Sequence, residues 1–510
     1  MVTCVDSIGL CGMEAHRVRV ETDISQGLPS FDIVGLPDAA VKESKDRVRS
    51  AIKNCGFRFP LGKIVVNLAP ADVKKFGPVY DLAILLGLLG ASEQLDASVF
   101  QDYAVLGELS LSGTVSPVAG VLPMVLAAQE FGFRRVIVPA DNAREAAVSQ
   151  SIQVFGVKTV QELLDFLTKQ RELSPARYIP AEAVQTVFGE DFCDVKGQQE
   201  AKRALEIAAC GGHNVLLIGA PGSGKSMLAK RLPTILPAMT PQESIETTKI
   251  HSVSGLLTPQ SPLITQRPFR APHYTVSAAG LTGGGSFPKP GEISLAHNGV
   301  LFLDELPEFS RTAKEVLRQP LEDGIVTISR VSGKTTYPSS FMLVAAMNPC
   351  PCGYFGHPTR ECTCTPIQVN RYLSRISGPL LDRIDLHIEV MPVEFEELSS
   401  TRPQESSQEI RRRVQRIREL QQRRYEGTGV TCNARLTPAL LGTFCPMDDS
   451  AKALLHRSFD QLGLSARAYD RILKVARTIA DLDGKEIIGS FHIAEAIQYR
   501  SLDRKYWNRT

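Results

Sequence analysis

The sequence has no hydrophobic run long enough to cross a membrane. Its most apolar stretch, residues 82–91, is about ten residues long, whereas a membrane-spanning helix needs ~20. The N-terminal residues also lack the basic start, apolar core and small-residue cleavage site of a secretory signal peptide. We therefore expect a cytoplasmic protein with no membrane contact.

Neither a charge excess nor a disulfide framework is present. With 57 Lys and Arg against 55 Asp and Glu, the net charge of +2 does not indicate nucleic-acid binding, so any DNA contact must come from local basic groups. Of eleven cysteines, seven are scattered singly, a pattern typical of reduced thiols. The other four lie within fifteen residues of one another, from Cys350 to Cys364.

The pattern of apolar residues predicts an α/β protein of about three domains. In the N-terminal part we expect strands at residues 64–68 and 136–139 and helices at 81–89 and 121–130. Composition divides the chain into an N-terminal domain at 1–170, a linker at 171–188, an ATPase core at 189–393, a polar connector at 394–408 and a helical region at 409–510.

The helical region begins with an amphipathic pattern. Ile410, Val414, Ile417 and Leu420 share one face, and seven arginines between residues 411 and 424 occupy the others. A solvated helix face is the favoured interpretation of these arginines, and a DNA-binding patch is the alternative.

A phosphate-binding loop follows the first strand of the ATPase core. An apolar run at residues 214–218 leads into a match to G-x-x-x-x-G-K-[ST], and helical sequence follows. In this motif backbone N–H groups wrap the phosphates, the lysine reaches the β- and γ-phosphates, and the hydroxyl can ligate Mg²⁺. We predict ATP binding by Gly219, Ala220, Pro221, Gly222, Ser223, Gly224, Lys225 and Ser226.

Polar residues follow two further apolar strands. Residues 299–303 end in Asp304 and Glu305. A carboxylate at a strand tip beside the phosphates completes a magnesium site, and its neighbour can polarise the attacking water. We therefore assign Asp304 to the metal and Glu305 to water activation. Asn348 ends the strand at residues 341–347 and resembles the water-orienting residue of AAA+ proteins called sensor 1.

Two arginines resemble further parts of an AAA+ active site. Arg383 lies in a segment similar to the arginine-finger segment of the chelatase and MCM branches, and such a finger stabilises transition-state charge across a subunit boundary. Arg467 opens a helix that looks like sensor 2, with Arg471 as a second candidate for this position. For each arginine the alternative is an intramolecular salt bridge.

Several longer motifs resemble the YifB/ComM family of magnesium-chelatase-like AAA+ ATPases. They lie at residues 194–209, 213–214, 267–273, 297–299, 318–324 and 348–353. The resemblance covers essentially the whole chain. It implies a P-loop AAA+ core with a C-terminal helical lid, a homo-hexameric ring, and helicase activity in DNA branch migration during natural transformation.

The same resemblance indicates candidate DNA contacts. The glycine-rich stretch at residues 280–291, which contains Lys289, resembles the helix-2 insertion of this branch. A predicted hairpin, with strands ending at Arg330 and beginning at Lys334, resembles the pore-lining hairpin before sensor 1. A lysine there can bind phosphate without reading sequence. The alternative for each cation is an ordinary exposed side chain.

The N-terminal domain resembles the proteolytic domain of Lon, an α+β domain of the ribosomal protein S5 domain 2-like type. Lon needs a nucleophilic serine after Gly-Pro and a lysine base further on. Here Gly77-Pro78 is followed by Val79, and Leu122 stands where the lysine would fall. Neither apolar side chain can attack a carbonyl or take a proton, so we expect a non-catalytic domain for assembly or partner binding.

The cysteine cluster has the residue types of a structural zinc site. Cys350, Cys352, Cys362 and Cys364 form two C-x-C pairs, and four thiolates can close a tetrahedral Zn²⁺ site. His357 lies between the pairs as a spare ligand. A C-x-C pair is tighter than the usual C-x-x-C, so the alternative is a reduced, solvent-facing loop.

Three other functions compete with a DNA motor. A remodelling ATPase for protein partners would share the same ATPase core. A metal-chelatase ATPase subunit is less favoured because dedicated chelatase subunits lack the Lon-like front domain. An ATP-dependent protease is opposed by the missing dyad.

Overall fold

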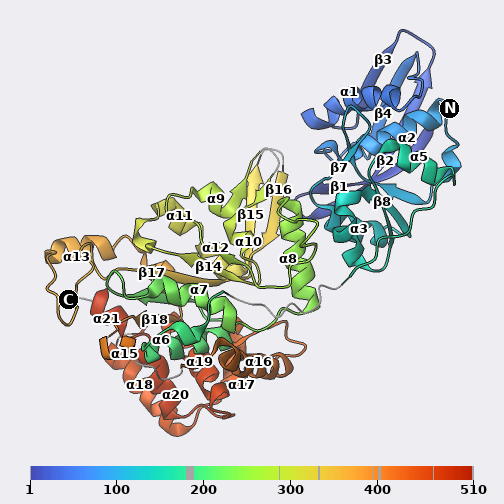
Figure 1. Ribbon diagram of the computed structural model, residues 1–510. Helices are drawn as coiled ribbons and strands as arrows, with labels where there is room; N and C mark the ends of the chain where they lie inside the picture. The colour runs from blue at the N-terminus through green and yellow to red at the C-terminus, as the bar shows by residue number, and fades with distance from the viewer. Residues whose placement is uncertain are drawn as a thin grey trace.

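The N-terminal region is built on a mixed sheet. The computed structural model describes residues 2–179, 189–285, 288–330, 333–393, 395–399, 404–462 and 464–507. Within them, seven strands form this N-terminal sheet in the order β3-β4-β2-β1-β5-β8-β9 (Figure 1). Its strands are β1 (Thr3–Cys11), β2 (Glu14–Ser25), β3 (Ser30–Val34), β4 (Lys63–Ala69), β5 (Tyr103–Val105), β8 (Arg135–Pro139) and β9 (Gln153–Val157).

Helices and short strands complete this region. They are α1 (Ala39–Asn54), α2 (Asp81–Ala91), β6 (Glu108–Leu109), β7 (Val115–Ser116), α3 (Val121–Glu130), α4 (Ala143–Ala146) and α5 (Val160–Leu167). The predicted strands at 64–68 and 136–139 are β4 and β8, and the predicted helices at 81–89 and 121–130 are α2 and α3. Every residue of α2 is buried against β1 and β2. Glycine makes this close approach possible, since a Cβ at Gly87 would lie 2.4 Å from Thr22 Oγ1.

A second, parallel sheet forms the centre of the molecule. In the described chain five strands follow the order β11-β14-β17-β10-β18. They are β10 (Val215–Ile218), β11 (Phe269–Arg270), β14 (Val300–Leu303), β17 (Met342–Met347) and β18 (Leu386–Glu389). All pairings are parallel, and β10, β14 and β17 are fully buried, as their apolar sequences predict.

Helices and two hairpins surround the parallel sheet. The helices are α6 (Gln199–Gly211), α7 (Lys225–Ile235), α8 (Pro241–Val253), α9 (Ala278–Thr282), α10 (Glu292–Leu295), α11 (Arg311–Glu315), α12 (Arg318–Asp323), α13 (Pro366–Leu373) and α14 (Gly378–Leu381). The hairpins pair β12 (Gly283–Gly284) with β13 (Lys289–Pro290), and β15 (Ile325–Arg330) with β16 (Gly333–Pro338). The second hairpin confirms the predicted one, except that Gly333 pairs with Arg330 and belongs to a strand. Residues 331–332 of the predicted turn lie outside the described residues.

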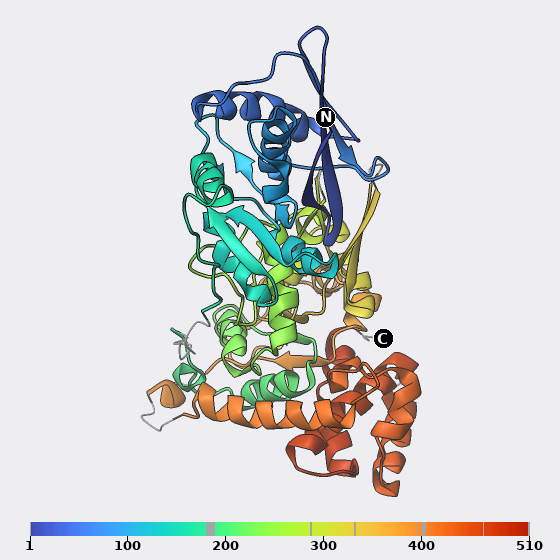
Figure 2. The ribbon, with the colours of Figure 1, turned by 90° about the vertical axis from the view of Figure 1, so that its right-hand side faces the viewer.

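The C-terminal helices pack on the same core as the sheet. They are α15 (Phe395–Ser399), α16 (Ser407–Arg424), α17 (Pro438–Phe444), α18 (Asp449–Leu462), α19 (Ala466–Leu482), α20 (Ser490–Gln498) and α21 (Leu502–Tyr506). Figure 2 shows α16 as a long helix along the base of the sheet region, where it contacts α6 and α7. Apolar side chains of α16 and α19 share one core with β10 and β17.

The structure adds detail to three predicted segments. The glycine-rich stretch at residues 280–291 contains β12 and β13. The connector at 394–408 contains α15, and α16 begins at Ser407 because Ser406 and Glu409 form a capping box. Leu173 and Ala176, placed in the linker, pack against the N-terminal core. Residues 180–188, 286–287, 394 and 400–403 of these segments lie outside the described residues.

The N-terminal region meets the rest of the protein at α8. Val253 belongs to the N-terminal core, and Gly120 N donates to Ser252 O at 3.0 Å. Ser252 Oγ donates to the buried carboxylate of Glu145. Figure 1 shows α8 between α3 and the parallel sheet. No helix of the described chain is long and apolar enough to span a membrane.

Candidate functional site

The phosphate-binding loop lies between β10 and the buried first turn of α7. Gly222 and Gly224 have φ of 77° and 88°, which glycine adopts without steric cost. Lys225 Nζ donates to Gly219 O at 2.8 Å, Ala220 O at 2.9 Å and Asn348 Oδ1 at 3.2 Å. Burial lowers the pKa of this ammonium, while Asp304 and Glu305 oppose the shift. The lysine is therefore already directed into the loop.

Polar residues from three neighbouring strands meet at this end of the sheet. Ser226 Oγ donates to Asp304 Oδ2 at 2.7 Å, so the two predicted magnesium ligands are adjacent. Asn348 follows β17 and contacts Lys225. Glu305 is exposed and has φ of 52°, in the left-handed region. The predicted nucleotide and magnesium residues therefore gather at the carboxyl ends of β10, β14 and β17, where ligands bind in such sheets.

The predicted finger Arg383 and the two candidates for sensor 2 lie together, away from the phosphate-binding loop. Arg383, Arg467 and Arg471 line one cavity of about 350 Å³ with the start of β10. Arg383 donates to Pro379 O at 2.7 Å and forms an ion pair with Glu322. Arg467 Nη1 lies 4.0 Å from Asp382 Oδ2, and its side chain is 60% exposed. The intramolecular ion pairs considered as the alternative for these arginines therefore exist, but the arginines still line a shared cavity.

The sheet separates this cavity from the phosphate-binding loop. Asn214 lines the cavity and precedes β10, whereas Gly219 follows it. The strand between them has four residues, a length of roughly 13 Å at ~3.3 Å per residue. Arg383 precedes β18, which runs parallel to β10 with Leu386 opposite Val215. The arginines and the phosphate-binding loop therefore lie at opposite ends of one sheet.

A buried polar network holds the arginine end together, and sequence reasoning missed it. Asn214 Nδ2 donates to Arg383 O at 2.9 Å, and Asn214 Oδ1 accepts from Leu343 N at 2.8 Å. Asn214 N donates to Asp385 Oδ2 at 3.0 Å, and Arg471 forms an ion pair with Asp385. Asn214 thus fixes the Arg383 segment to both β10 and β17.

A histidine extends this network to α19. His213 and Thr478 Oγ1 share a hydrogen bond of 2.7 Å, and His213 Nδ1 lies 3.5 Å from Asp385 Oδ2. Although burial raises the pKa of Asp385, the charge of Arg471 and the His213 contact hold it far below its usual range. The sequence did contain a signal for this network, because residues 213–214 form one of the motifs that resemble the YifB/ComM family.

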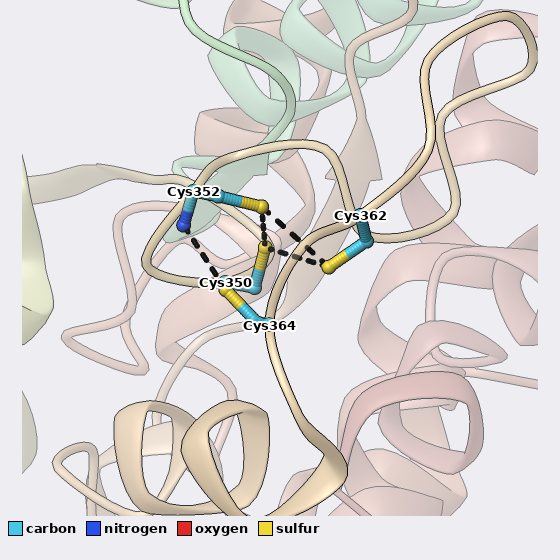
Figure 3. A group of neighbouring side chains, drawn as sticks. All are labelled: Cys350, Cys352, Cys362 and Cys364. Atoms are coloured by element: carbon cyan, nitrogen blue, oxygen red, sulfur yellow. Dashed lines mark hydrogen bonds between the residues drawn. The ribbon is translucent and has the colours of Figure 1, made fainter.

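The four clustered cysteines converge, as Figure 3 shows. Their sulfur atoms all lie within 4.8 Å of one another, with Cys350, Cys352 and Cys362 separated by 3.4–3.6 Å. Tetrahedral bonds of ~2.3 Å place sulfurs about 3.8 Å apart, so the group fits Zn²⁺. Cys364 Sγ accepts from Cys352 N, a contact of the kind that orients metal ligands.

The spare ligand His357 does not join this group. Its Nδ1 accepts from Thr359 N and Arg360 N, and its ring contacts Tyr354. The loop has a different neighbour, since a Cβ at Gly353 would lie 2.4 Å from Pro221 Cδ. The cysteine loop therefore packs directly on the phosphate-binding loop.

The candidate DNA contacts lie near the N-terminal region. Lys334 is exposed on β16, opposite Ser329. Lys289 is exposed on β13 and lines a cavity of about 320 Å³ between the insertion and the N-terminal region. The side chain of Arg330 lies outside the described part of the chain. Tyr337 Oη donates to Pro288 O at 2.5 Å and so connects the two hairpins.

The positions of the Lon dyad hold buried apolar side chains. Val79 is 7% exposed and Leu122 is fully buried. Gly77 and Val79 line the same cavity as Lys289. The N-terminal region thus has a cavity at the position of the Lon nucleophile, where apolar Val79 stands in place of the serine.

Comparisons with known proteins agree with these observations. Family models described as "Magnesium chelatase, subunit ChlI", "Subunit ChlI of Mg-chelatase" and "Magnesium chelatase, subunit ChlI C-terminal" match residues 191–398, 20–142 and 404–500. The chain is 32% identical over 165 residues to Lon protease 2 of Bacillus subtilis, covering 29% of each protein.

Two relatives match along nearly the whole chain. Competence protein ComM of Haemophilus influenzae is 46% identical over 500 residues, covering 97% of this chain and 96% of the relative. Protein YifB of Escherichia coli is 45% identical over 495 residues, with coverage of 97% and 96%. The predicted resemblance is confirmed, and the chain belongs to the YifB/ComM family of magnesium-chelatase-like AAA+ proteins.

Proposed function

We propose that this chain is an ATP-hydrolysing motor that assembles into a ring and moves on DNA. One observation carries the proposal. The phosphate-binding residues lie at one end of the parallel sheet, and Arg383 and Arg467 lie at the other. Repeated head-to-tail contact between subunits would join these complementary halves, and such contacts close into rings.

Each residue then has a distinct task in hydrolysis. Lys225 and the loop N–H groups bind the phosphates, and Ser226 and Asp304 would hold Mg²⁺, which neutralises phosphate charge when bound. Glu305 accepts a proton from the attacking water, and Asn348 orients that water. Arg383 and Arg467 of the next subunit stabilise charge on the phosphates as it develops.

Two observations support DNA as the partner: the similarity to ComM and the exposure of Lys334 and Lys289. The related ComM is named a competence protein, and Lys334 and Lys289 lie on hairpins joined by the Tyr337 contact. We expect single-stranded, duplex or forked DNA to stimulate ATP hydrolysis several-fold. Lys334→Ala should reduce this stimulation, whereas Lys158→Ala, at an exposed site in the N-terminal region, should not. Unchanged hydrolysis with every DNA would reject a DNA motor.

A remodelling ATPase for protein partners is the second candidate. The cavity of about 320 Å³ at Gly77, Val79 and Lys289 favours it, because this volume and apolar lining suit ligand recognition. Stimulation of hydrolysis by unfolded casein, and not by DNA, would support this function over the first.

Zinc binding by the cysteine loop is a separate part of the proposal. The four sulfur positions fit a tetrahedral site, and the contact of Gly353 with Pro221 joins the loop to the phosphate-binding loop. A structural metal here would fix that loop in place. Elemental analysis of protein purified without chelator should find about one zinc per chain.

A further inference from the structure

A second cation-rich cavity lies between the C-terminal helices and the parallel sheet. Its volume is about 70 Å³, and its walls include Arg267, Arg418, Cys432 and Arg435, together with one carboxylate, Glu243. Arg267 precedes β11, Arg418 belongs to α16, and Arg435 ends the short 3₁₀ helix Asn433–Arg435. Three separate segments therefore bring guanidinium groups to one small space.

Only one of these arginines is neutralised. Arg267 forms an ion pair with Glu243 at 3.0 Å and donates to Pro237 O and Asn298 O. Arg435 donates to Ser340 Oγ at 3.1 Å. Within the described residues no ion pair joins Arg418 or Arg435 to a carboxylate. Arg418 interacts with the Cys432 side chain, while its Nη1 is buried without a hydrogen-bond acceptor. Burying charges without a partner is costly.

The pKa of Cys432 shows how the charges of the neighbouring arginines act inside the cavity. Its side chain is 5% exposed, and burial alone raises the pKa of a thiol. The nearby charges of Arg418 and Arg435 outweigh that effect, so the pKa of Cys432 is lowered. The two guanidinium groups therefore favour negative charge at the position of this thiol.

We propose that this cavity binds a small oxyanion of the phosphate class between Arg418, Arg435 and Arg267. Guanidinium groups match the geometry of such oxyanions with paired N–H donors. The volume of about 70 Å³ exceeds the ~10–15 Å³ that one water requires, but it is too small for a nucleoside. The cavity therefore cannot enclose a whole nucleotide, whereas inorganic phosphate or sulfate fits within it.

Occupation would brace the C-terminal helices against the sheet. Arg418 and Arg435 come from the helical side, and Arg267 comes from the sheet side. Gly212, Phe341 and Arg435 line both this cavity and the one that holds Arg383 and Arg467. An anion bound here would therefore stiffen the wall behind the predicted finger, with a ligand distinct from ATP.

Calorimetric titration of inorganic phosphate into the full chain tests the site. The protein is saturated with a non-hydrolysable ATP analogue so that the phosphate-binding loop is filled, and sodium chloride keeps ionic strength constant. We expect Arg418→Gln to weaken phosphate binding at least tenfold, while Arg416→Gln, at an exposed position of the same helix, leaves it unchanged. Equal phosphate affinity in Arg418→Gln and wild type would overturn the proposal, as would no binding to wild type.

A second test introduces a carboxylate into the cavity by mutation and leaves all three arginines in place. Cys432→Asp supplies an anion inside the cavity, and Cys432→Asn has the same shape without the charge. We expect the Asp variant to melt at a higher temperature than the Asn variant and to lose its response to phosphate. A lower melting temperature for the Asp variant, or an unchanged phosphate response, would contradict an anion site.

Discussion

The two ends of the parallel sheet differ in how they hold their charged groups. At the carboxyl ends of the strands, Lys225 and Ser226 contact groups that also serve the nucleotide site, namely Asn348 and Asp304. At the other end, Arg383 and Arg471 are held by carboxylates, Glu322 and Asp385. The first end is arranged to receive phosphates, and the second is arranged to present cations.

This difference is the basis of the proposal that one nucleotide contacts two subunits. An arginine separated by the length of β10 from the loop of its own chain cannot stabilise a phosphate bound there. In the proposed ring, a head-to-tail contact would place the same arginine at the loop of a neighbouring subunit. The intramolecular salt bridges would then orient the arginines before that contact forms.

The largest expected effect is at the arginine end. Arg383→Ala should bind ATP with normal affinity but hydrolyse it about 10³-fold more slowly, the usual range for a lost arginine finger. Arg457→Ala, at an exposed position on α18, serves as the control and should hydrolyse normally. ATP hydrolysis by purified Arg383→Ala at the wild-type rate would show that Arg383 is not an arginine finger.

At the opposite end, Glu305→Gln should separate binding from chemistry. Removal of a general base typically costs about 10²–10⁴-fold, and we expect a loss of about 10²-fold here with ATP retained. Lys225→Ala should instead lose nucleotide binding, because the phosphates lose their main cation. Equilibrium binding of a fluorescent ATP analogue, measured beside phosphate release, distinguishes the two variants. Normal hydrolysis by Glu305→Gln would show that another group activates water.

A smaller effect on hydrolysis is expected from replacing Asn214, which holds the Arg383 segment to the parallel sheet. Asn214→Ala leaves Leu343 N and Arg383 O without their partner, at a cost of about 1–3 kcal/mol. We expect hydrolysis to fall about tenfold, with ATP affinity unchanged. In mixed rings the defect should follow the subunit that supplies the arginines. A defect confined to the variant's own nucleotide pocket would contradict a positioning role for Asn214.

The smallest expected effect concerns the cysteine loop. Cys362→Ser should remove zinc and lower DNA-stimulated hydrolysis by a few fold, because the loop packs on Pro221. Cys55→Ser, in the N-terminal region, should change neither quantity, and that region should stay folded in both variants. A zinc-free wild-type protein whose four clustered thiols are all freely alkylated would show that the loop holds no metal.

Sequence was sufficient for the phosphate-binding end because its signals are local. A buried strand, a glycine motif and a following helix are contiguous in residues 214–235, and strand ends in a parallel sheet lie together. Asp304 and Asn348 could therefore be placed beside Lys225 without coordinates. The start of α16 was also within reach, since the capping box of Ser406 and Glu409 is a sequence signature.

The arginine end could not be predicted in the same way, because its partners are distant in sequence. Asn214 and Arg383 are separated by 169 positions, and no local pattern joins them. The arginines of α16 illustrate the same point. They were predicted to form a solvated face, and Arg412, Arg413, Arg416 and Arg423 are exposed. Three of the arginines also have specific surroundings: Arg413 pairs with Glu206, Arg424 pairs with Asp481, and Arg418 lines the cavity of about 70 Å³. Tertiary packing therefore decides which arginines of α16 form ion pairs or line a cavity and which remain exposed.

Mixing two inactive variants tests the shared site most directly. Lys225→Ala subunits retain the arginines but lack a working pocket, and Arg383→Ala subunits retain the pocket but lack the finger. If the two ends of the sheet serve one nucleotide across a subunit boundary, the mixture should hydrolyse ATP well above the sum of the separate proteins. Mass photometry with ATP shows that rings, expected to be hexamers, have formed, and co-purification of the untagged variant with a tagged one shows that they are mixed. Mixed rings with no recovered hydrolysis would contradict the account.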